Sequence, residues 1–347
     1  MDGASTQTFL CCRKRWPLVV APMALTILSL FCGAASAQTA ANSAGLRLET
    51  KIPLGAVRGR IDHMAIDLQR QRLLVAELGN DSVGIVDLKQ SKTIHTIGGL
   101  AEPQGVGYAP ATDTIYVANA RDGSVRIFHG ADYAPSGRIE LGSDADNIRL
   151  DAETNRVLIG HGSGAIAAID LAQQKKVSTS QLPAHPESFQ LWPQPKRIFV
   201  NVPGAHAVVV LDGTTGEQKD KWPVPEGGNF PMAIDLANGR VLIVSRNPPR
   251  LIAYAEDNGS VIARTDTCGD SDDLFVDAKR NRVYVSCGAG FIDILETQRD
   301  GYRRIGRIAT AAGARTSLFV PDLDMLLLAV RATGSEPAAI WVFRPTP

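Results

Sequence analysis

A segment of five residues recurs seven times along the chain, at intervals of 41 to 43 residues. Each copy is a run of β-branched, aliphatic or aromatic residues, and five of the seven copies begin with arginine. The copies occupy residues 72–76, 114–118, 156–160, 197–201, 240–244, 282–286 and 325–329. Because these runs are short, apolar and bounded by Gly, Asn, Asp and Pro, they predict β-strands and not the longer amphipathic helices of a helical solenoid. The chain is therefore restricted to a repeated β-sheet unit.

Three further strand-like pieces surround each of these runs. A strand precedes the run, as in 64–67, 148–151, 232–235 and 274–277, and a third strand follows it, as in 82–87, 124–128, 165–170 and 207–212. A more polar fourth strand, such as 92–97, ends the unit. Polarity that increases outward is typical of four-stranded blades that radiate from an axis. The sequence predicts an all-β fold, a seven-bladed β-propeller of four-stranded antiparallel blades.

The ends of the chain predict how the ring closes. The seventh unit stops after its third strand, 339–343, while residues 46–54 precede the first unit and have the pattern of a fourth strand. An open sheet edge at the closure point would be free to pair with other chains. We therefore expect the N-terminal strand to join the last blade.

The first 37 residues have the pattern of a cleavable signal peptide. Arg13, Lys14 and Arg15 form a positive start, residues 16–32 are uncharged and largely apolar, and residues 35–37 read Ala-Ser-Ala. We predict a signal peptide at 1–37, a flexible mature N-terminus at 38–45 and the propeller at 46–347. The expected location is the periplasm or the medium, with no attachment to a membrane after cleavage.

Charge and cysteine content narrow the function. The chain has 36 basic and 36 acidic residues, and cleavage after residue 37 would leave a net charge of about −2 without a basic stripe, so we do not expect a nucleic-acid partner. Cleavage also leaves two cysteines, Cys268 and Cys287. In an oxidising compartment they can form a disulfide, and two unpaired thiols are the alternative. Covalent c-type haem is excluded because no Cys-x-x-Cys-His occurs.

Polar and ionisable residues gather just before the predicted inner strands, which start at one mouth of the central channel. Asp and Asn at such places can simply cap turns. Clustered carboxylates, however, require a cation or a proton, which favours a site for a small polar or cationic ligand. The candidates are Arg60, Asp62, His63, Glu102, Gln104, Asp144, Asp146, Asn147, His185, Glu187, Asn229, Asp270, Asp272, Asp273 and Arg315.

Two motifs carry a resemblance to a known family. Residues 115–119 read Ile-Tyr-Val-Ala-Asn and residues 122–128 read Asp-Gly-Ser-Val-Arg-Ile-Phe, while 212–217 read Asp-Gly-Thr-Thr-Gly-Glu. These resemble the YVTN β-propeller repeat and its inter-strand turn, and residues 46–347 look most like exported YncE-like proteins. The resemblance implies the blades strongly and no single reaction, since propellers of this shape include sugar lactonases, electron-donating dehydrogenase subunits and binding proteins.

Three functions remain open on these grounds. We favour a non-enzymatic binding or scaffolding protein, expected to be a monomer, whose polar mouth holds a small polar molecule or a partner's loop. The alternative is a lactonase-like hydrolase that uses Ca²⁺ or a similar divalent cation. By analogy with lactonase-type propellers its ligands would be His63, Glu187, Asn229 and Asp272. A weaker alternative is a periplasmic electron-transfer accessory.

Overall fold

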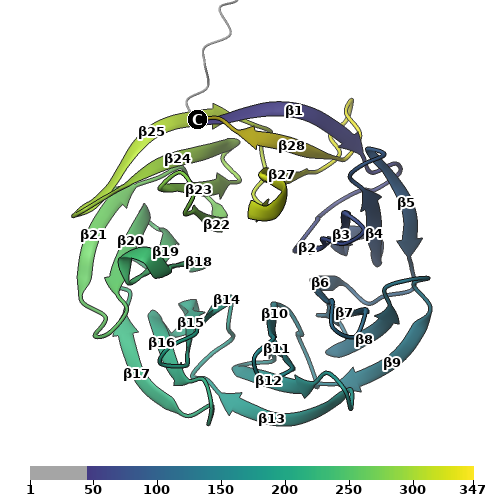
Figure 1. Cartoon of the computed structure of the whole chain (residues 1–347), viewed down its shortest axis with the longest axis horizontal. Helices are drawn as coiled ribbons and strands as arrows, with labels where there is room; N and C mark the ends of the chain where they lie inside the picture. Colours follow the sequence, from purple (N-terminus) through teal and green to yellow (C-terminus); the bar gives the residue numbers. More distant parts are fainter. Residues whose placement is uncertain (1–44) are drawn as a thin grey trace, which may run out of the picture. The chain divides into compact units, whose positions relative to one another are not determined.

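Twenty-eight β-strands form seven antiparallel four-stranded sheets around a central axis (Figure 1). The computed structural model describes residues 45–347, so the predicted signal peptide and nearly all of the predicted segment 38–45 lie outside the described residues. Within the described range the helices are the three-residue 3₁₀ turns η1 (Leu78–Asn80), η2 (Pro203–Ala205), η3 (Leu236–Asn238) and η4 (Pro321–Leu323). None of these could cross a membrane. The predicted seven-bladed β-propeller is confirmed.

Each blade runs outward from an inner strand to a fourth strand at the rim. The inner strands are β2 (Met64–Asp67), β6 (Pro103–Ala109), β10 (Ile148–Asp151), β14 (Ser188–Trp192), β18 (Asn229–Asp235), β22 (Ser271–Asp277) and β26 (Ser317–Val320). The second strands are β3 (Arg72–Glu77), β7 (Thr114–Asn119), β11 (Arg156–His161), β15 (Arg197–Val202), β19 (Arg240–Arg246), β23 (Arg282–Cys287) and β27 (Met325–Val330).

The outer half of each blade completes the sheet. The third strands are β4 (Ser82–Asp87), β8 (Ser124–His129), β12 (Ala165–Asp170), β16 (Ala207–Asp212), β20 (Pro249–Ala255), β24 (Phe291–Gln298) and β28 (Ala339–Pro345). The fourth strands are β5 (Lys92–Ile97), β9 (Pro135–Glu140), β13 (Lys175–Gln181), β17 (Gln218–Pro223), β21 (Val261–Asp266), β25 (Gly301–Ala309) and, from the other end of the chain, β1 (Leu46–Pro53).

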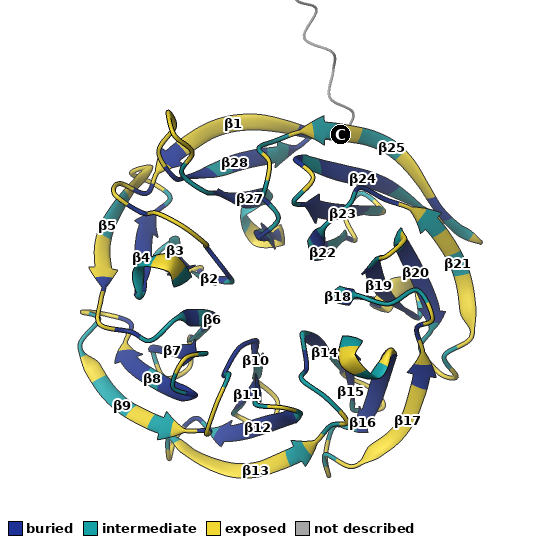
Figure 2. Ribbon diagram, turned by 180° about the vertical axis from the view of Figure 1, so that it is seen from behind, coloured by how far each residue is buried: buried dark blue, intermediate teal, exposed yellow. Residues whose placement is uncertain are grey.

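Burial follows this order of strands. The second and third strands are almost wholly buried, whereas the fourth strands are mostly exposed (Figure 2). Seven hydrophobic clusters, one between each pair of neighbouring blades, form the core. A repeat unit alone would leave these faces in water, so the ring is stable only when every blade has two neighbours.

The closing strand behaves as the fourth strand of the seventh blade. β1 pairs antiparallel with β28, from Leu46 opposite Pro345 to Pro53 opposite Ala339. A register shift interrupts this pairing, and the third and fourth strands of all six other blades show the same kind of shift. The predicted closure by the N-terminal strand is confirmed.

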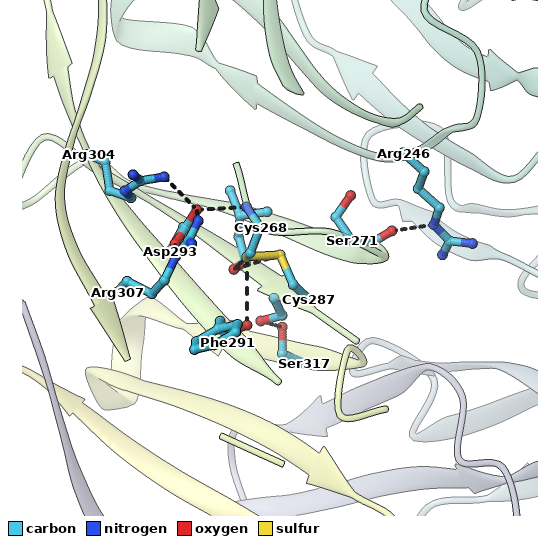
Figure 3. The surroundings of a disulfide bond; sticks show 11 residues. Arg246, Cys268, Ser271, Cys287, Phe291, Asp293, Arg304, Arg307 and Ser317 are labelled. Atoms are coloured by element: carbon cyan, nitrogen blue, oxygen red, sulfur yellow. Dashed lines mark hydrogen bonds and ion pairs between the residues drawn. A yellow bond between two sulfur atoms is a disulfide. The ribbon is translucent and has the colours of Figure 1, made fainter. Parts of the chain in front are cut away.

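A disulfide lies in the sixth blade. Cys268, in the loop before β22, is bonded to Cys287 at the end of β23, with the two Cα atoms 5.9 Å apart. Both residues are buried, and the Cys268 amide donates to the Asp293 carboxylate at 2.8 Å (Figure 3). The bond therefore ties the loop that carries Asp270 to the second strand of its own blade.

Candidate functional site

The repeat sorts the mouth residues into levels. In every blade one inner-strand residue lies opposite the fourth residue of the second strand. We use this residue as a reference and count backward from it toward the mouth. The reference residues are Met64, Val106, Ile148, Phe189, Met232, Leu274 and Ser317.

The positions three and four before the reference differ in burial in every blade. The residues three before the reference are buried in all seven blades: Ile61, Pro103, Ala145, Pro186, Asn229, Ser271 and Ala314. None of the residues four before it is buried, and this level holds Arg60, Glu102, Asp144, His185 and Asp270. The level two before it holds Asp62, Gln104, Asp146, Glu187, Asp272 and Arg315, and the level one before it holds His63, Asn147 and Asp273. Of the fifteen candidates, only Asn229 occupies the level three before the reference, which is buried in every blade.

The contacts of Asn229 agree with its position. It is fully buried, and its Nδ2 donates to Asn201 Oδ1 at 2.9 Å and to the Ala207 carbonyl oxygen at 3.0 Å. Asn201 in turn donates to the carbonyl oxygens of Phe230 and Pro231. This amide pair connects two blades and does not line the mouth.

Eight candidates line a small pocket of about 40 Å³ at the mouth. They are Arg60, Asp62, His63, Asp146, Asn147, Glu187, Asp272 and Asp273. Four other candidates form ion pairs beside this pocket. His185 pairs with Asp144 and Asp146. Arg315 pairs with Asp270 and Asp272, and Asp270 also pairs with Arg246. Gln104 reaches Asp144 at 3.5 Å, and Glu102 pairs with Arg121 at 3.3 Å.

Asp146 lies between two histidines. Its carboxylate oxygens are 3.4 Å from His63 Nε2 and 3.9 Å from His185 Nε2, and His185 Nδ1 contacts the Gly162 carbonyl oxygen at 2.6 Å. Burial alone would lower the pKa of His63, but its hydrogen bond to Asp146 and the nearby carboxylates raise it to about 10. The same opposing effects raise the pKa of His185 to about 9. Burial alone would raise the pKa of Asp146, but its ion pairs with the two histidines outweigh this effect and lower the pKa to about 2.

Asn147 adds a competing contact to this cluster. Its Nδ2 donates to the Glu187 carbonyl oxygen at 2.6 Å and lies 2.9 Å from His63 Nε2. An amide donor favours an unprotonated His63 Nε2, whereas the Asp62 and Asp146 carboxylates favour a protonated Nε2. Two carboxylates outweigh one amide, so His63 is a cation at neutral pH.

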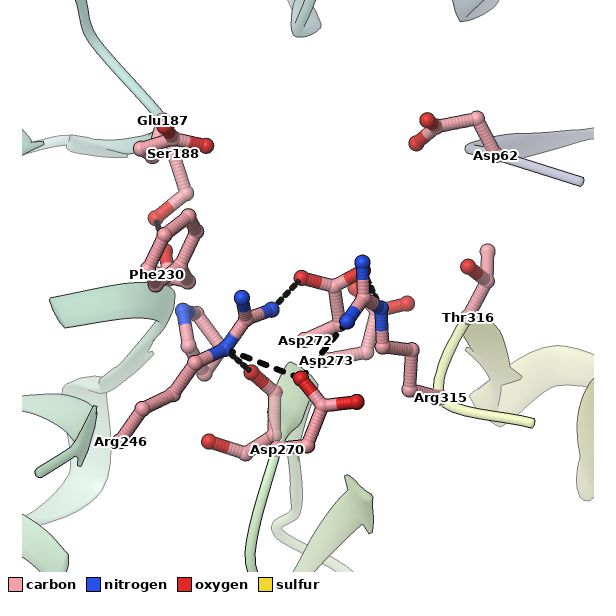
Figure 4. Close-up of polar contacts among 12 residues, drawn as sticks. Asp62, Glu187, Ser188, Phe230, Arg246, Asp270, Asp272, Asp273, Arg315 and Thr316 are labelled. Carbon is pink, nitrogen blue, oxygen red and sulfur yellow. Dashed lines mark hydrogen bonds and ion pairs between the residues drawn. The ribbon is translucent and has the colours of Figure 1, made fainter. Parts of the chain in front are cut away.

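On the opposite side of the mouth, two arginines enclose one aspartate (Figure 4). Arg246 Nη2 contacts Asp272 Oδ1, and Arg315 Nε lies 3.0 Å from Asp272 Oδ2. Both arginines also pair with Asp270, at 3.6 Å and 2.6 Å respectively. The Arg246 guanidinium stacks over Phe230, 3.7 Å from the ring centroid. Contacts with two carboxylates hold each guanidinium, and stacking on Phe230 adds to this for Arg246, so this half of the mouth is preorganised.

Three acids, Glu187, Asp62 and Asp273, have elevated pKa values despite these cations. Burial raises the pKa of Glu187 to about 7, and the charge of Asp146 adds to the increase. Burial also raises the pKa of Asp62 to about 6, although His63 opposes it and Arg60 lies 2.7 Å away. Of the three, Glu187 has no hydrogen bond or ion pair from its carboxyl group to any residue within 45–347. Its carboxyl group is therefore free of protein partners within that range and can accept from a ligand.

Replacing Asp273 with asparagine is expected to stabilise the protein above pH 7 and to have little effect near pH 4. Burial raises the pKa of Asp273 to about 7, so the wild-type carboxyl stabilises the fold in its neutral form and loses this contribution as the pH rises. The loss is at most about 1.4 kcal/mol per pH unit. Asparagine cannot ionise and can still accept from the Ser317 amide, as Asp273 does at 2.6 Å.

Thermal melts of Asp273→Asn and wild type at pH 4.5 and pH 8.5 measure this difference. Asp300→Asn, at an exposed hairpin, is the matched control and should behave as wild type at both pH values. A difference in melting temperature between Asp273→Asn and wild type that does not change with pH would contradict the assignment.

A larger cavity continues inward from the mouth pocket. It has a volume of about 380 Å³ and is lined mainly by apolar inner-strand residues such as Leu150, Phe275 and Leu318. His63, Arg149, Met232 and Asp273 line both spaces. The mouth pocket and the channel therefore share one polar boundary.

The side chains proposed for a divalent cation do not form one ligand set. Within residues 45–347 no group of three or more His, Cys, Asp or Glu is arranged to hold a metal ion. Asp272 is held by two arginines and Asn229 by another amide. Asp146 and Asp272 are thus balanced by side-chain cations of the protein itself.

Three residues complete the site and were not among the fifteen candidates: Arg149, Phe230 and Arg246, of which the sequence placed Arg246 on the mouth face. Arg246 ends a second strand on the mouth face and Phe230 lies two before the reference residue, so their places follow from the repeat. Arg149 lies one after its reference residue. The other six blades have Ala65, Gly107, Gln190, Ala233, Phe275 and Leu318 there, so alignment of the repeats reveals a single charge.

Comparison with known proteins identifies the architecture. No family model matches the sequence, and no curated protein matches it. Solved structures do match: one chain of the "Crystal Structure of Mitotic Checkpoint Complex" aligns with a TM-score of 0.69 over 96% of this chain and 99% of that chain, at 12% identity. At this identity the likeness shows the fold alone. In all, 1765 solved chains match, so the fold by itself does not select a function.

Proposed function

We propose that the protein is an exported, non-enzymatic binding protein of the YVTN-repeat type that holds a small polar ligand at the mouth of its channel. The observation that carries this proposal is the Glu187 carboxyl group. It lines the mouth pocket, is half-buried, and has no partner within the described chain, while Asp146 and Asp272 nearby are held by cations. A half-buried carboxylate that is unpaired within the protein can accept from a ligand donor without first breaking a contact inside the protein.

The chemistry of the pocket indicates which group of the ligand enters. Glu187 is surrounded by the negative charges of Asp146 and Asp272, both of which raise its pKa. An ammonium group, or a cluster of hydroxyl donors, would be attracted by the Glu187 carboxylate, which has no ion-pair partner of its own within residues 45–347. The volume of about 40 Å³ admits only a small group, so the rest of the ligand must extend outward or along the channel.

Export is supported by the disulfide. A Cys268–Cys287 bond is typical of proteins that fold in an oxidising compartment, and it agrees with the signal-peptide pattern of residues 1–37. We propose the periplasm or the medium as the location.

At pH 8, above the raised pKa of Glu187 of about 7, Glu187→Gln is expected to weaken ligand binding at the mouth by at least about tenfold, because it removes a charged hydrogen-bond acceptor. Ethanolamine, putrescine, choline and glucosamine are the probes for a thermal-shift screen, followed by calorimetric titration of any probe that stabilises the protein. The matched control is Glu153→Gln, which removes an exposed carboxylate that pairs with Lys196 at 2.9 Å. No stabilisation by any probe, or equal stabilisation of wild type and Glu187→Gln, would refute the proposal.

A further inference from the structure

Arg149 is the only charged residue at its level of the channel wall. The equivalent positions of the other blades carry Ala65, Gly107, Gln190, Ala233, Phe275 and Leu318, as the pairing of inner and second strands shows. The residue is placed by β10, a four-residue strand whose first residue, Ile148, packs into the core between the second and third blades. A charge here is not required by the blade, since six blades fold without one.

The Arg149 guanidinium has few partners. Its Nη1 donates to the Ile148 carbonyl oxygen at 2.8 Å, and its centre lies 5.7 Å from the Phe189 ring centroid. Within residues 45–347 it forms no ion pair, although Asp146 and Asp273 lie close enough to interact through space. Arginine carries five N–H donors, so four of them have no hydrogen-bond acceptor within that range. This contrasts with Arg246 and Arg315, whose charges are met by Asp270 and Asp272.

Two spaces of different character border the Arg149 guanidinium. Arg149 lines both the mouth pocket of about 40 Å³ and the channel of about 380 Å³. The channel walls around it are apolar, with Met64, Val106, Leu150 and Leu274 among them. A cavity of this size with few convergent polar groups is typical of small-molecule sites.

We propose that the channel binds a monocarboxylate with an apolar body, whose carboxylate pairs with Arg149 and whose body fills the apolar channel. A planar carboxylate matches the two parallel donors of a guanidinium. A doubly charged phosphate is disfavoured, because only one uncompensated cation is present and Asp146 and Asp273 lie nearby. The neutral form of Asp273, whose pKa burial raises to about 7, can donate to the same carboxylate. The inference deepens the proposed binding role but rests on Arg149 and not on Glu187.

The test uses 3-phenylpropionate as the probe, with 3-phenylpropanol, 3-phenylpropylammonium and inorganic phosphate as comparisons, in calorimetric titrations of the full chain. We expect 3-phenylpropionate to bind wild type and to bind Arg149→Met at least about tenfold more weakly. The alcohol and the ammonium compound should bind wild type at least about tenfold more weakly than the acid. The matched control is Arg126→Met, which removes a guanidinium on β8 that lies 5.8 Å from the Phe128 ring centroid.

A second variant keeps the charge and fills the space. Leu318→Trp adds bulk to the channel wall at the level of Arg149 and is expected to abolish binding of the acid even if Arg149→Met does not fold. Equal affinity of the acid for wild type and both variants would overturn the inference. It would also be overturned by equal binding of the alcohol, or by binding of phosphate in place of the acid. Loss of acid binding in Arg149→Met with retention in Glu187→Gln separates this site from the proposed mouth site.

Discussion

Deletion of β1, Leu46–Pro53, is expected to lower the melting temperature by at least about 10 °C. This strand is the fourth strand of the seventh blade, and it comes from the opposite end of the chain. Without it, the edge of β28 is left unpaired and Leu46 and Ile52 are lost from the clusters on the two sides of the blade. Both are fully buried, and removal of each buried aliphatic side chain costs about 2–5 kcal/mol.

Point variants test the same closure without removing backbone. Leu46→Ala with Ile52→Ala should lower the melting temperature by roughly 8 °C or more, at about 2 °C per kcal/mol for a chain of this size. Leu48→Ala is the control on the same strand, because Leu48 is 40% exposed, and it should melt within about 2 °C of wild type. A deletion variant with the melting curve of the full chain would contradict closure by β1.

Removal of the disulfide is expected to have the second largest effect. Cys268→Ala with Cys287→Ala should cost about 3 kcal/mol, since the bond closes a loop with a sequence separation of 19 residues and both side chains are buried. A reducing agent should lower the melting temperature of wild type by about 6 °C and leave the double variant unchanged. Equal sensitivity of the two proteins to the reducing agent would show that the bond does not stabilise the fold.

The disulfide also supports the mouth. Next to Cys287, the Gly288 amide donates to the Asp270 carbonyl oxygen at 2.7 Å, and the Asp270 side chain pairs with Arg246 and Arg315. Loss of the bond should therefore weaken binding of a mouth ligand as well as stability. The screen described for Glu187→Gln measures this second effect on the same double variant.

The repeat allowed the blades and their closure to be predicted, because each second strand is a run of apolar residues at a fixed interval. The contrast in burial between the positions three and four before the reference also follows from the repeat, since successive residues of an extended chain point to opposite sides. Asn229 is an example. The sequence predicted it at the mouth, yet it lies three before its reference residue, at the level that is buried in every blade.

Side-chain partners could not be predicted from the sequence. Asp272 and Glu187 occupy equivalent positions in two blades, but two arginines hold Asp272 and no described side chain holds the Glu187 carboxyl group. The difference depends on Arg246 and Arg315, which reach across from neighbouring blades and are 26 and 43 residues distant from Asp272 in the sequence. Such pairs depend on side-chain directions that a repeat does not encode.

The most direct test of ligand binding at the mouth is a crystal structure of the protein soaked with the probe that gives the largest thermal shift. The account predicts that the donor group of the probe lies within hydrogen-bond distance of the Glu187 carboxylate, in the pocket that Asp146 and Asp272 also line. A probe bound elsewhere on the molecule, with only solvent beside Glu187, would contradict it.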